Sequence, residues 1–213
     1  MTRGSLAGAA AQAELAERLV DAALRVLAQH GSAELTVRRV AEEAGSSTMG
    51  VYSRFGGRPG LLEALYQRTF TELTDALAVV PVTADALHDL GELSCAYRRF
   101  ALDGPHRYGF MFSRPLPDFE PADGLHAEVL QAAFAPLIDA VHRAGAQGLG
   151  ATRAAYCLWC VMHGLVGLEL TDVLRAPLTS WGVTGEDCAA AERMYRAGVQ
   201  AMIAGLELHQ AVA

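Results

Sequence analysis

The feature that most constrains the fold of this chain is the helical spacing of its apolar residues. In residues 15–27 apolar side chains recur at intervals of three and four, which places Leu15, Leu19, Ala22 and Val26 on one face of a helix. Comparable spacing continues along most of the 213 residues. No segment shows the apolar–polar alternation of a half-buried strand, and the sequence has no internal repeat. The sequence therefore predicts an all-α fold.

Capping residues divide this pattern into separate helices. The first is expected to end near His30 and Gly31, because glycine suits the position that follows a helix. A short second helix should begin after Thr36, a good N-cap, and end at Gly45. The segments "SRPLPDFEPADG" and "APLTSWGVTG" are predicted loops. Further helices are expected at about 47–54, 61–77, 84–101, 105–112, 123–145, 150–174 and 185–207.

These elements predict two folded domains. Residues 13–73 would form a small three-helix unit with a connecting helix. Residues 74–213 would form a larger helical bundle, and residues 1–12 a flexible N-terminus.

The net charge is −7, and only the first 60 residues, with seven arginines against six acidic residues, are slightly basic. A nucleic-acid surface would therefore lie in the N-terminal part.

The chain is expected to be a cytoplasmic protein that does not enter a membrane. Its longest apolar run without a formal charge, Ala154–Leu168, has 15 residues, and roughly 20 are needed to span a bilayer. Near the N-terminus, charged residues such as Glu14, Glu17 and Arg18 interrupt any apolar core of a signal peptide.

The spacing between Val37 and Arg54 is typical of a helix-turn-helix. A small residue, Ala41, lets two short helices approach, Gly45 permits a tight turn, and Val51 can fill the space between them. The outward face of the second helix would then carry hydroxyl groups and an aromatic ring, which suit DNA phosphates and base edges. A plain helical hairpin within a bundle is the alternative.

The segment "LTVRRVAEEAGSSTMGVYSRFGGRPGLLEALY" resembles the DNA-binding domain of the TetR family of transcriptional repressors, and the resemblance covers about residues 13–73. Relatives often have Lys where this chain has Arg58, and Val where it has Ser46. The resemblance implies that Tyr52 and Arg58 contact phosphates of double-stranded operator DNA and that Thr36 and Arg38 assist. The candidates for contact with base edges or nearby backbone are Ser47, Thr48, Met49 and Ser53, while Gly50 could allow close backbone approach and Arg54 could contact a phosphate. Met49 could equally be a core residue, and Arg54 a solvated neighbour of the first helix.

The second half contains the distinctive segment "YCLWCVMHGLVGLEL". Its Cys157, Cys160 and His163 could hold a metal or sense thiol chemistry, but a fourth ligand is missing nearby and cysteines often pack between helices. No metal or cofactor is predicted. The spacing of Trp159, His163 and Gly164 resembles a TetR subgroup with a Trp-His-Gly signature. His163 would either bond a ligand or be a satisfied core histidine.

By the same resemblance, the C-terminal domain would bind a small-molecule effector and form a homodimer through helices near 150–174 and 185–207. The predicted ligand-binding residues are Tyr97, Phe100, Phe110, Trp159 and His163, because aromatic side chains commonly line such cavities. The sequence has no nucleophile–base pair, paired-carboxylate motif or phosphate-binding loop, so an enzyme or carrier is the less favoured alternative. The prediction is a dimeric repressor that an effector releases from its operator.

Overall fold

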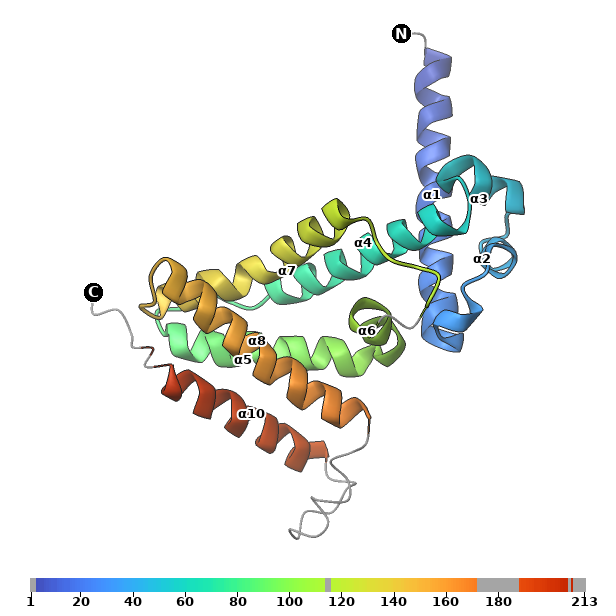
Figure 1. The fold of residues 1–213 in the computed structure, drawn as a ribbon. Helices are drawn as coiled ribbons and strands as arrows, with labels where there is room; N and C mark the ends of the chain where they lie inside the picture. The colour runs from blue at the N-terminus through green and yellow to red at the C-terminus, as the bar shows by residue number, and fades with distance from the viewer. Residues whose placement is uncertain (1–2, 114–115, 172–187, 207, 209–213) are drawn as a thin grey trace. The chain divides into compact units, whose positions relative to one another are not determined.

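A computed structural model of the chain describes residues 3–113, 116–171, 188–206 and 208 (Figure 1). Within these ranges every regular element is a helix and none is a strand, so the all-α prediction is confirmed. None of the described helices is both long enough and apolar enough to cross a membrane. The predicted loop at 176–185 lies outside the described residues.

The chain divides into two compact units. The N-terminal unit is Met1–Glu72 with Gly104–Val129, and the C-terminal unit is Leu73–Asp103 with Leu130–Ala213. The chain first passes from the N-terminal unit to the C-terminal unit between Glu72 and Leu73, within two residues of the predicted boundary at 73–74. The sequence did not predict that residues 104–129 return to the N-terminal unit.

The N-terminal unit is built around its first helix, α1 (Arg3–His30), which starts inside the segment predicted to be flexible. Helices α2 and α3 and the later helix α6 all contact α1. The glycine after α1, Gly31, has a φ of 78° and donates its N–H to the carbonyl of Leu27, as expected of a helix end. The other elements of this unit are η1 (Ser32–Glu34), α2 (Val37–Glu43), α3 (Thr48–Phe55), the first part of α4 (Arg58–Ala78), α6 (Pro105–Phe112) and the start of α7 (Asp123–Arg143).

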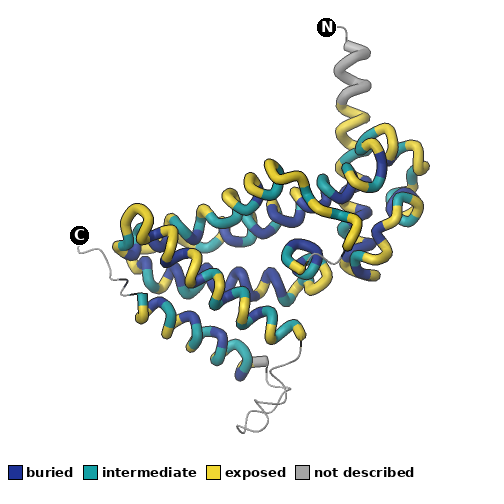
Figure 2. Tube along the Cα trace, viewed as in Figure 1, coloured by how far each residue is buried: buried dark blue, intermediate teal, exposed yellow. Residues whose placement is uncertain are grey.

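The C-terminal unit has three main helices, α5 (Ala86–Asp103), α8 (Leu149–Leu170) and α10 (Cys188–Gly205), which all contact one another. Helix α5 is buried along most of its length (Figure 2). Helix α8 buries a stripe of Ala155, Leu158, Met162 and Val166, which recur every three or four residues. The predicted helices at 150–174 and 185–207 are thus present where they can be described.

Candidate functional site

The turn between α2 and α3 is a compact helix-turn-helix connection. Helix α2 begins at a capped residue, because Thr36 Oγ1 accepts the Arg39 N–H at 3.2 Å. It ends with two paired bonds: Gly45 N–H donates to Glu42 O at 3.1 Å, and Ser46 N–H donates to Ala41 O at 2.8 Å. The φ of Gly45 is 60°, a conformation that glycine adopts without strain. The predicted cap and turn are both confirmed.

Close packing fixes the orientation of α3. The side chains of Val40 and Val51 are fully buried where α2 and α3 meet, as the spacing predicted. At the other end of α3, a Cβ added to Gly60 would lie 2.1 Å from the carbonyl oxygen of Phe55. Only glycine allows the first turn of α4 to approach the end of α3 so closely. The inner side of α3 is therefore held at both ends.

The outer side of α3 is exposed and mostly polar. Ser47 is the N-cap residue, and its hydroxyl makes no capping bond. Thr48 is also exposed, as are Met49 at 68% and Tyr52 at 54% of their full surface. The exposed fraction of Met49 shows that it is not a core residue. Ser53 is exposed as well and donates its hydroxyl to Gly50 O at 3.0 Å.

Two predicted contact residues on α3 lie closer to the protein interior. A Cβ on Gly50 would be 2.7 Å from Ser46 Oγ, which can rotate away, and in ordinary contact with Leu15 Cδ2 at 3.7 Å. Arg54 is half-buried, and its Nε is buried without a hydrogen-bond partner in the described part of the chain. Contacts of these two residues with DNA stay predictions.

The two predicted phosphate-binding arginines differ in how firmly the protein holds them. Arg38 is almost fully exposed and pairs with Glu42, one helical turn later, at 2.8 Å. Arg58 is half-buried: its Nε donates to Leu35 O at 2.8 Å, and its Nη1 forms an ion pair with Asp118. The Asp118 contact joins residues 60 positions apart, and no local sequence pattern signals it.

Three of the predicted ligand-binding residues lie together in the C-terminal unit. Tyr97 Oη is 3.1 Å from His163 Nδ1, and the rings of Trp159 and His163 have centroids 5.3 Å apart. The ring of Phe134 meets Trp159 edge to face at 5.9 Å. Burial lowers the pKa of His163, which favours its neutral form. This hydrogen-bonded aromatic cluster joins α5 to α8.

The other two predicted ligand residues do not join this cluster in the same way. Phe100 is buried on α5. Phe110 belongs to the N-terminal unit, where its ring stacks on Phe119 at 5.8 Å and meets Tyr66 edge on. All five residues were predicted to bind a ligand because they are aromatic or polar. The sequence could not show which unit contains α6, the helix that carries Phe110.

The C-terminal unit also contains a cavity of about 210 Å³ between the end of α4, α5 and α7. Its polar wall includes Asp89, which pairs with Arg143 at 2.6 Å. Burial raises the pKa of Asp89, but hydrogen bonds from Arg143 and Thr83 outweigh that effect and lower it to about 2. None of the predicted ligand-binding residues lines this cavity. The lining residues are Leu77, Ala78, Val80, Pro81, Val82, Asp89, Leu93, Pro136, Asp139 and Arg143.

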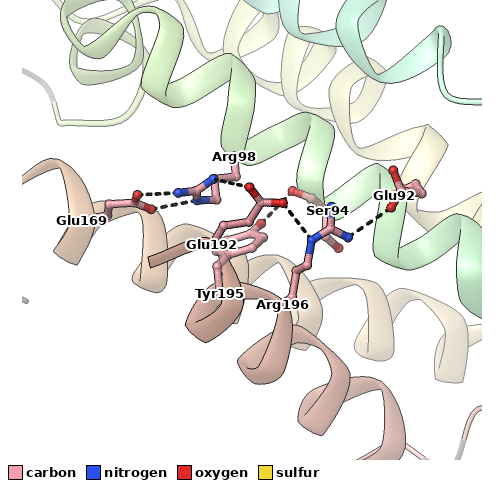
Figure 3. Close-up of polar contacts among 7 residues, drawn as sticks. All are labelled: Glu92, Ser94, Arg98, Glu169, Glu192, Tyr195 and Arg196. Atoms are coloured by element: carbon pink, nitrogen blue, oxygen red, sulfur yellow. Dashed lines mark hydrogen bonds and ion pairs between the residues drawn. The ribbon is translucent and has the colours of Figure 1, made fainter. Parts of the chain in front are cut away.

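A network of charged residues ties α8 and α10 to α5 (Figure 3). Arg98, only 7% exposed, donates two hydrogen bonds to the carboxylate of Glu169 at 2.9 and 2.6 Å. Its guanidinium also lies 5.8 Å from the ring centre of Tyr195. Bidentate arginine–carboxylate pairs fix geometry well, so this pair sets how α8 lies against α5.

The α10 side of the network uses Arg196 and Tyr195. Arg196 bonds to Glu192 on its own helix at 2.9 Å and to Glu92 on α5 at 3.1 Å. Tyr195 donates its hydroxyl to Ser94 O on α5 at 2.8 Å. Sequence reasoning missed this network, because its members come from three helices and are separated by up to 104 positions.

The outer side of α8 is exposed yet apolar. Tyr156 is 58% exposed, Leu168 is partly exposed, and Cys157 and Cys160 are exposed between them. Within the described residues, no group of three His, Cys, Asp or Glu side chains is placed to hold a metal ion. The sequence signal for this surface was the absence of charge between Ala154 and Leu168.

Two family models match the chain. One, described as bacterial regulatory proteins of the tetR family, matches residues 19–65. The other, described as tetracyclin repressor-like, C-terminal domain, matches residues 90–197, which is half of the chain. The chain belongs to the TetR family and is a DNA-binding transcriptional regulator.

Individual relatives agree with this assignment. An uncharacterized HTH-type transcriptional regulator of Mycobacterium tuberculosis is 27% identical over 158 residues, which are 74% of this chain and 71% of the relative. The structure of a TetR regulator from Streptomyces coelicolor covers 92% of the chain with a TM-score of 0.66 at 19% identity, and this chain covers 99% of it. A TetR variant from Acinetobacter baumannii in complex with minocycline covers 91%, with 96% of it covered, a TM-score of 0.60 and 18% identity. At these identities the two structures support the fold alone.

Proposed function

We propose that the chain is a homodimeric repressor whose α3 helices bind operator DNA and whose C-terminal unit binds a small-molecule effector that releases it. The observation that carries this proposal is the contrast between the two sides of α3. Its inner side is fixed by Val51, and its outer side presents exposed hydroxyls together with Tyr52. A rigid short helix with a polar exposed face is what reading the major groove requires.

In this proposal the DNA contacts fall into two groups. Ser47, Thr48 and Met49 lie at the exposed start of α3, where side chains of recognition helices reach base edges. Tyr52 and Arg38 are exposed groups that would bond phosphates. Phosphate contacts do not depend on sequence and weaken with salt, so affinity should fall steeply as salt rises.

The homodimer would form through the outer side of α8 together with α10. An exposed apolar face of this kind is a common sign of a protein interface. The Arg98 and Arg196 networks hold both helices on α5 and so present them as one rigid surface. A second copy of the same surface would bury both faces around a twofold axis. Two DNA-binding units would then meet half-sites about 34–36 Å apart.

The effector would bind beside the Tyr97–His163–Trp159 cluster. A neutral imidazole, a phenol and an indole suit an aromatic or largely apolar molecule with a few polar groups. The A. baumannii TetR variant, with minocycline bound, has the same overall fold. The Trp159, His163 and Gly164 spacing also supports membership of the Trp-His-Gly subgroup. The effector must bind the released conformation more tightly than the DNA-bound one, because otherwise it shifts nothing.

The test is operator binding by fluorescence anisotropy. A duplex is first selected by the purified protein from a random library, and an unrelated duplex serves as the comparison. Tyr52→Ala should weaken binding to both duplexes by about 10-fold, because a phosphate contact is sequence-independent. Gln67→Ala, an exposed change on α4, is the matched control and should leave affinity unchanged. If no duplex is selected, or if Tyr52→Ala binds as tightly as the parent, the proposed DNA surface is wrong.

A further inference from the structure

Arg58 is already occupied within the protein at the place where a DNA phosphate is expected. Its Nε is fixed on the Leu35 carbonyl, which directs Nη1 to the Asp118 carboxylate. Arg58 also begins α4 close to the exposed ring of Tyr52: a Cβ at the adjoining Gly57 would lie 3.4 Å from Tyr52 Cε1. Arg58, which makes the ion pair, therefore directly follows a glycine that packs against Tyr52.

The segment that carries Asp118 is anchored to the same unit. Its neighbour Phe119 stacks on Phe110 and meets the ring of Tyr66 at 6.2 Å. Tyr66 Oη in turn lies 2.9 Å from Nδ1 of His126, at the start of α7. All these residues belong to the N-terminal unit, so the position of Asp118 is set by that unit itself.

We propose that Asp118 is an internal competitor for DNA: its carboxylate occupies Arg58 and must leave before that arginine can bind a phosphate. Carboxylate and phosphate bind arginine in the same way, through charge-assisted N–H···O bonds. This inference rests on the proposed function, since it concerns the regulation of the same DNA surface. Asp118 thereby lowers the affinity for all DNA and leaves sequence preference unchanged.

Exposure sets the strength of this competition. The Arg58 side chain is 26% exposed and that of Asp118 is 67% exposed. Such a pair is open to water and easily broken, so Asp118 restrains binding without blocking it. A second effect acts in the same direction, because the negative charge of Asp118 repels nearby phosphates. The two effects can be separated, since only the competition requires Arg58.

The experiment measures anisotropy of the selected duplex and of the unrelated duplex with five proteins. These are the parent, Asp118→Asn, Arg58→Ala, the double variant, and Asp123→Asn. Asp123→Asn is the matched control, because it removes one exposed charge from the same unit. Thermal unfolding of each variant checks that it is folded. Asp118→Asn changes an exposed side chain, so it should fold as the parent does.

The expected result is that Asp118→Asn binds both duplexes about two- to five-fold more tightly than the parent, because this factor corresponds to the free energy of an exposed ion pair. Asp123→Asn should change affinity by a smaller factor, and Arg58→Ala should weaken binding. The double variant should bind DNA more tightly than Arg58→Ala by no larger a factor than the one that separates Asp123→Asn from the parent. Parent-like or weaker binding by Asp118→Asn overturns the inference. So does an equally large gain in affinity when Asp118→Asn is added to Arg58→Ala. Either result leaves the proposed function standing, whereas failure of the parent to bind any duplex overturns both.

Discussion

Helices α3 and α8 both bury an apolar inner side, but their exposed outer sides differ, because that of α3 is mostly polar and that of α8 is apolar. Val51 in α3 and Leu158 in α8 are both fully buried against neighbouring helices. The exposed side of α3 carries hydroxyls and a tyrosine, whereas the exposed side of α8 carries Tyr156, two cysteines and leucines. The inner side therefore fixes the fold, and in the proposed function the outer side meets the partner, which is DNA for α3 and a second copy of the chain for α8.

A charge placed on the outer side of α8 should have the largest effect on the protein. Cys160→Arg should separate the dimer, because an arginine would be buried against the partner surface without an acceptor. Each chain would then bind one half-site, and operator affinity should fall by about 100-fold or more, since the second contact is no longer linked to the first. Sedimentation gives the oligomeric state and anisotropy the affinity.

The control for this change is Gln67→Arg, which adds the same charge to an exposed position of α4. It should leave the protein dimeric. A Cys160→Arg protein that still sediments as a dimer would show that α8 does not form the interface.

Shortening one buried side chain on each helix tests whether both inner sides stabilise the fold. Val51→Ala should lower the free energy of unfolding by roughly 1–3 kcal/mol and Leu158→Ala by roughly 2–5 kcal/mol, because each leaves a cavity in a packed core. Denaturant unfolding measures both values. The comparison fails if either variant is as stable as the parent.

Salt should sharpen the contrast between the outer sides. Arg38→Ala is expected to reduce the slope of log affinity against log salt by about one, because one phosphate contact is lost. Dimer formation through the apolar side of α8 should change little over the same salt range. A strong weakening of the dimer by salt would mean that charges, and not the apolar face, hold the two copies together.

The smallest predicted effect concerns His163. Because burial lowers its pKa, folding favours the neutral imidazole, and that contribution is complete above the unfolded pKa of about 6.5. As pH falls below 6.5, the unfolded chain takes up this proton first and the folded state loses stability. His163→Gln should therefore lose less stability than the parent between pH 7 and pH 5. Parallel pH profiles from thermal unfolding would show that His163 does not contribute.

Local features of the fold were predictable from the sequence, because they depend on neighbouring residues. The cap at Thr36, the turn at Gly45 and the ends of α6 follow from spacing and residue type alone. The start of α1 at Arg3 was missed, because the alanine-rich N-terminus carries no clear capping signal.

Long-range features were not predictable for a different reason. The ion pair of Arg58 with Asp118 and that of Arg98 with Glu169 join segments 60 and 71 residues apart. Such pairs follow from how helices pack, and helix packing leaves no pattern within either segment. For the same reason, the sequence could not show that Phe110, a predicted ligand-binding residue, packs in the N-terminal unit.

The mass of the complex between the parent protein and its selected duplex shows directly whether the chain binds DNA as a dimer. Mass photometry, or sedimentation with a labelled duplex, would count the chains on each DNA molecule. We expect chains in multiples of two on the selected duplex, and loss of the specific complex when Tyr52→Ala is used at the same concentration. Single chains on the selected duplex, or an equally stable complex with Tyr52→Ala, would contradict this expectation.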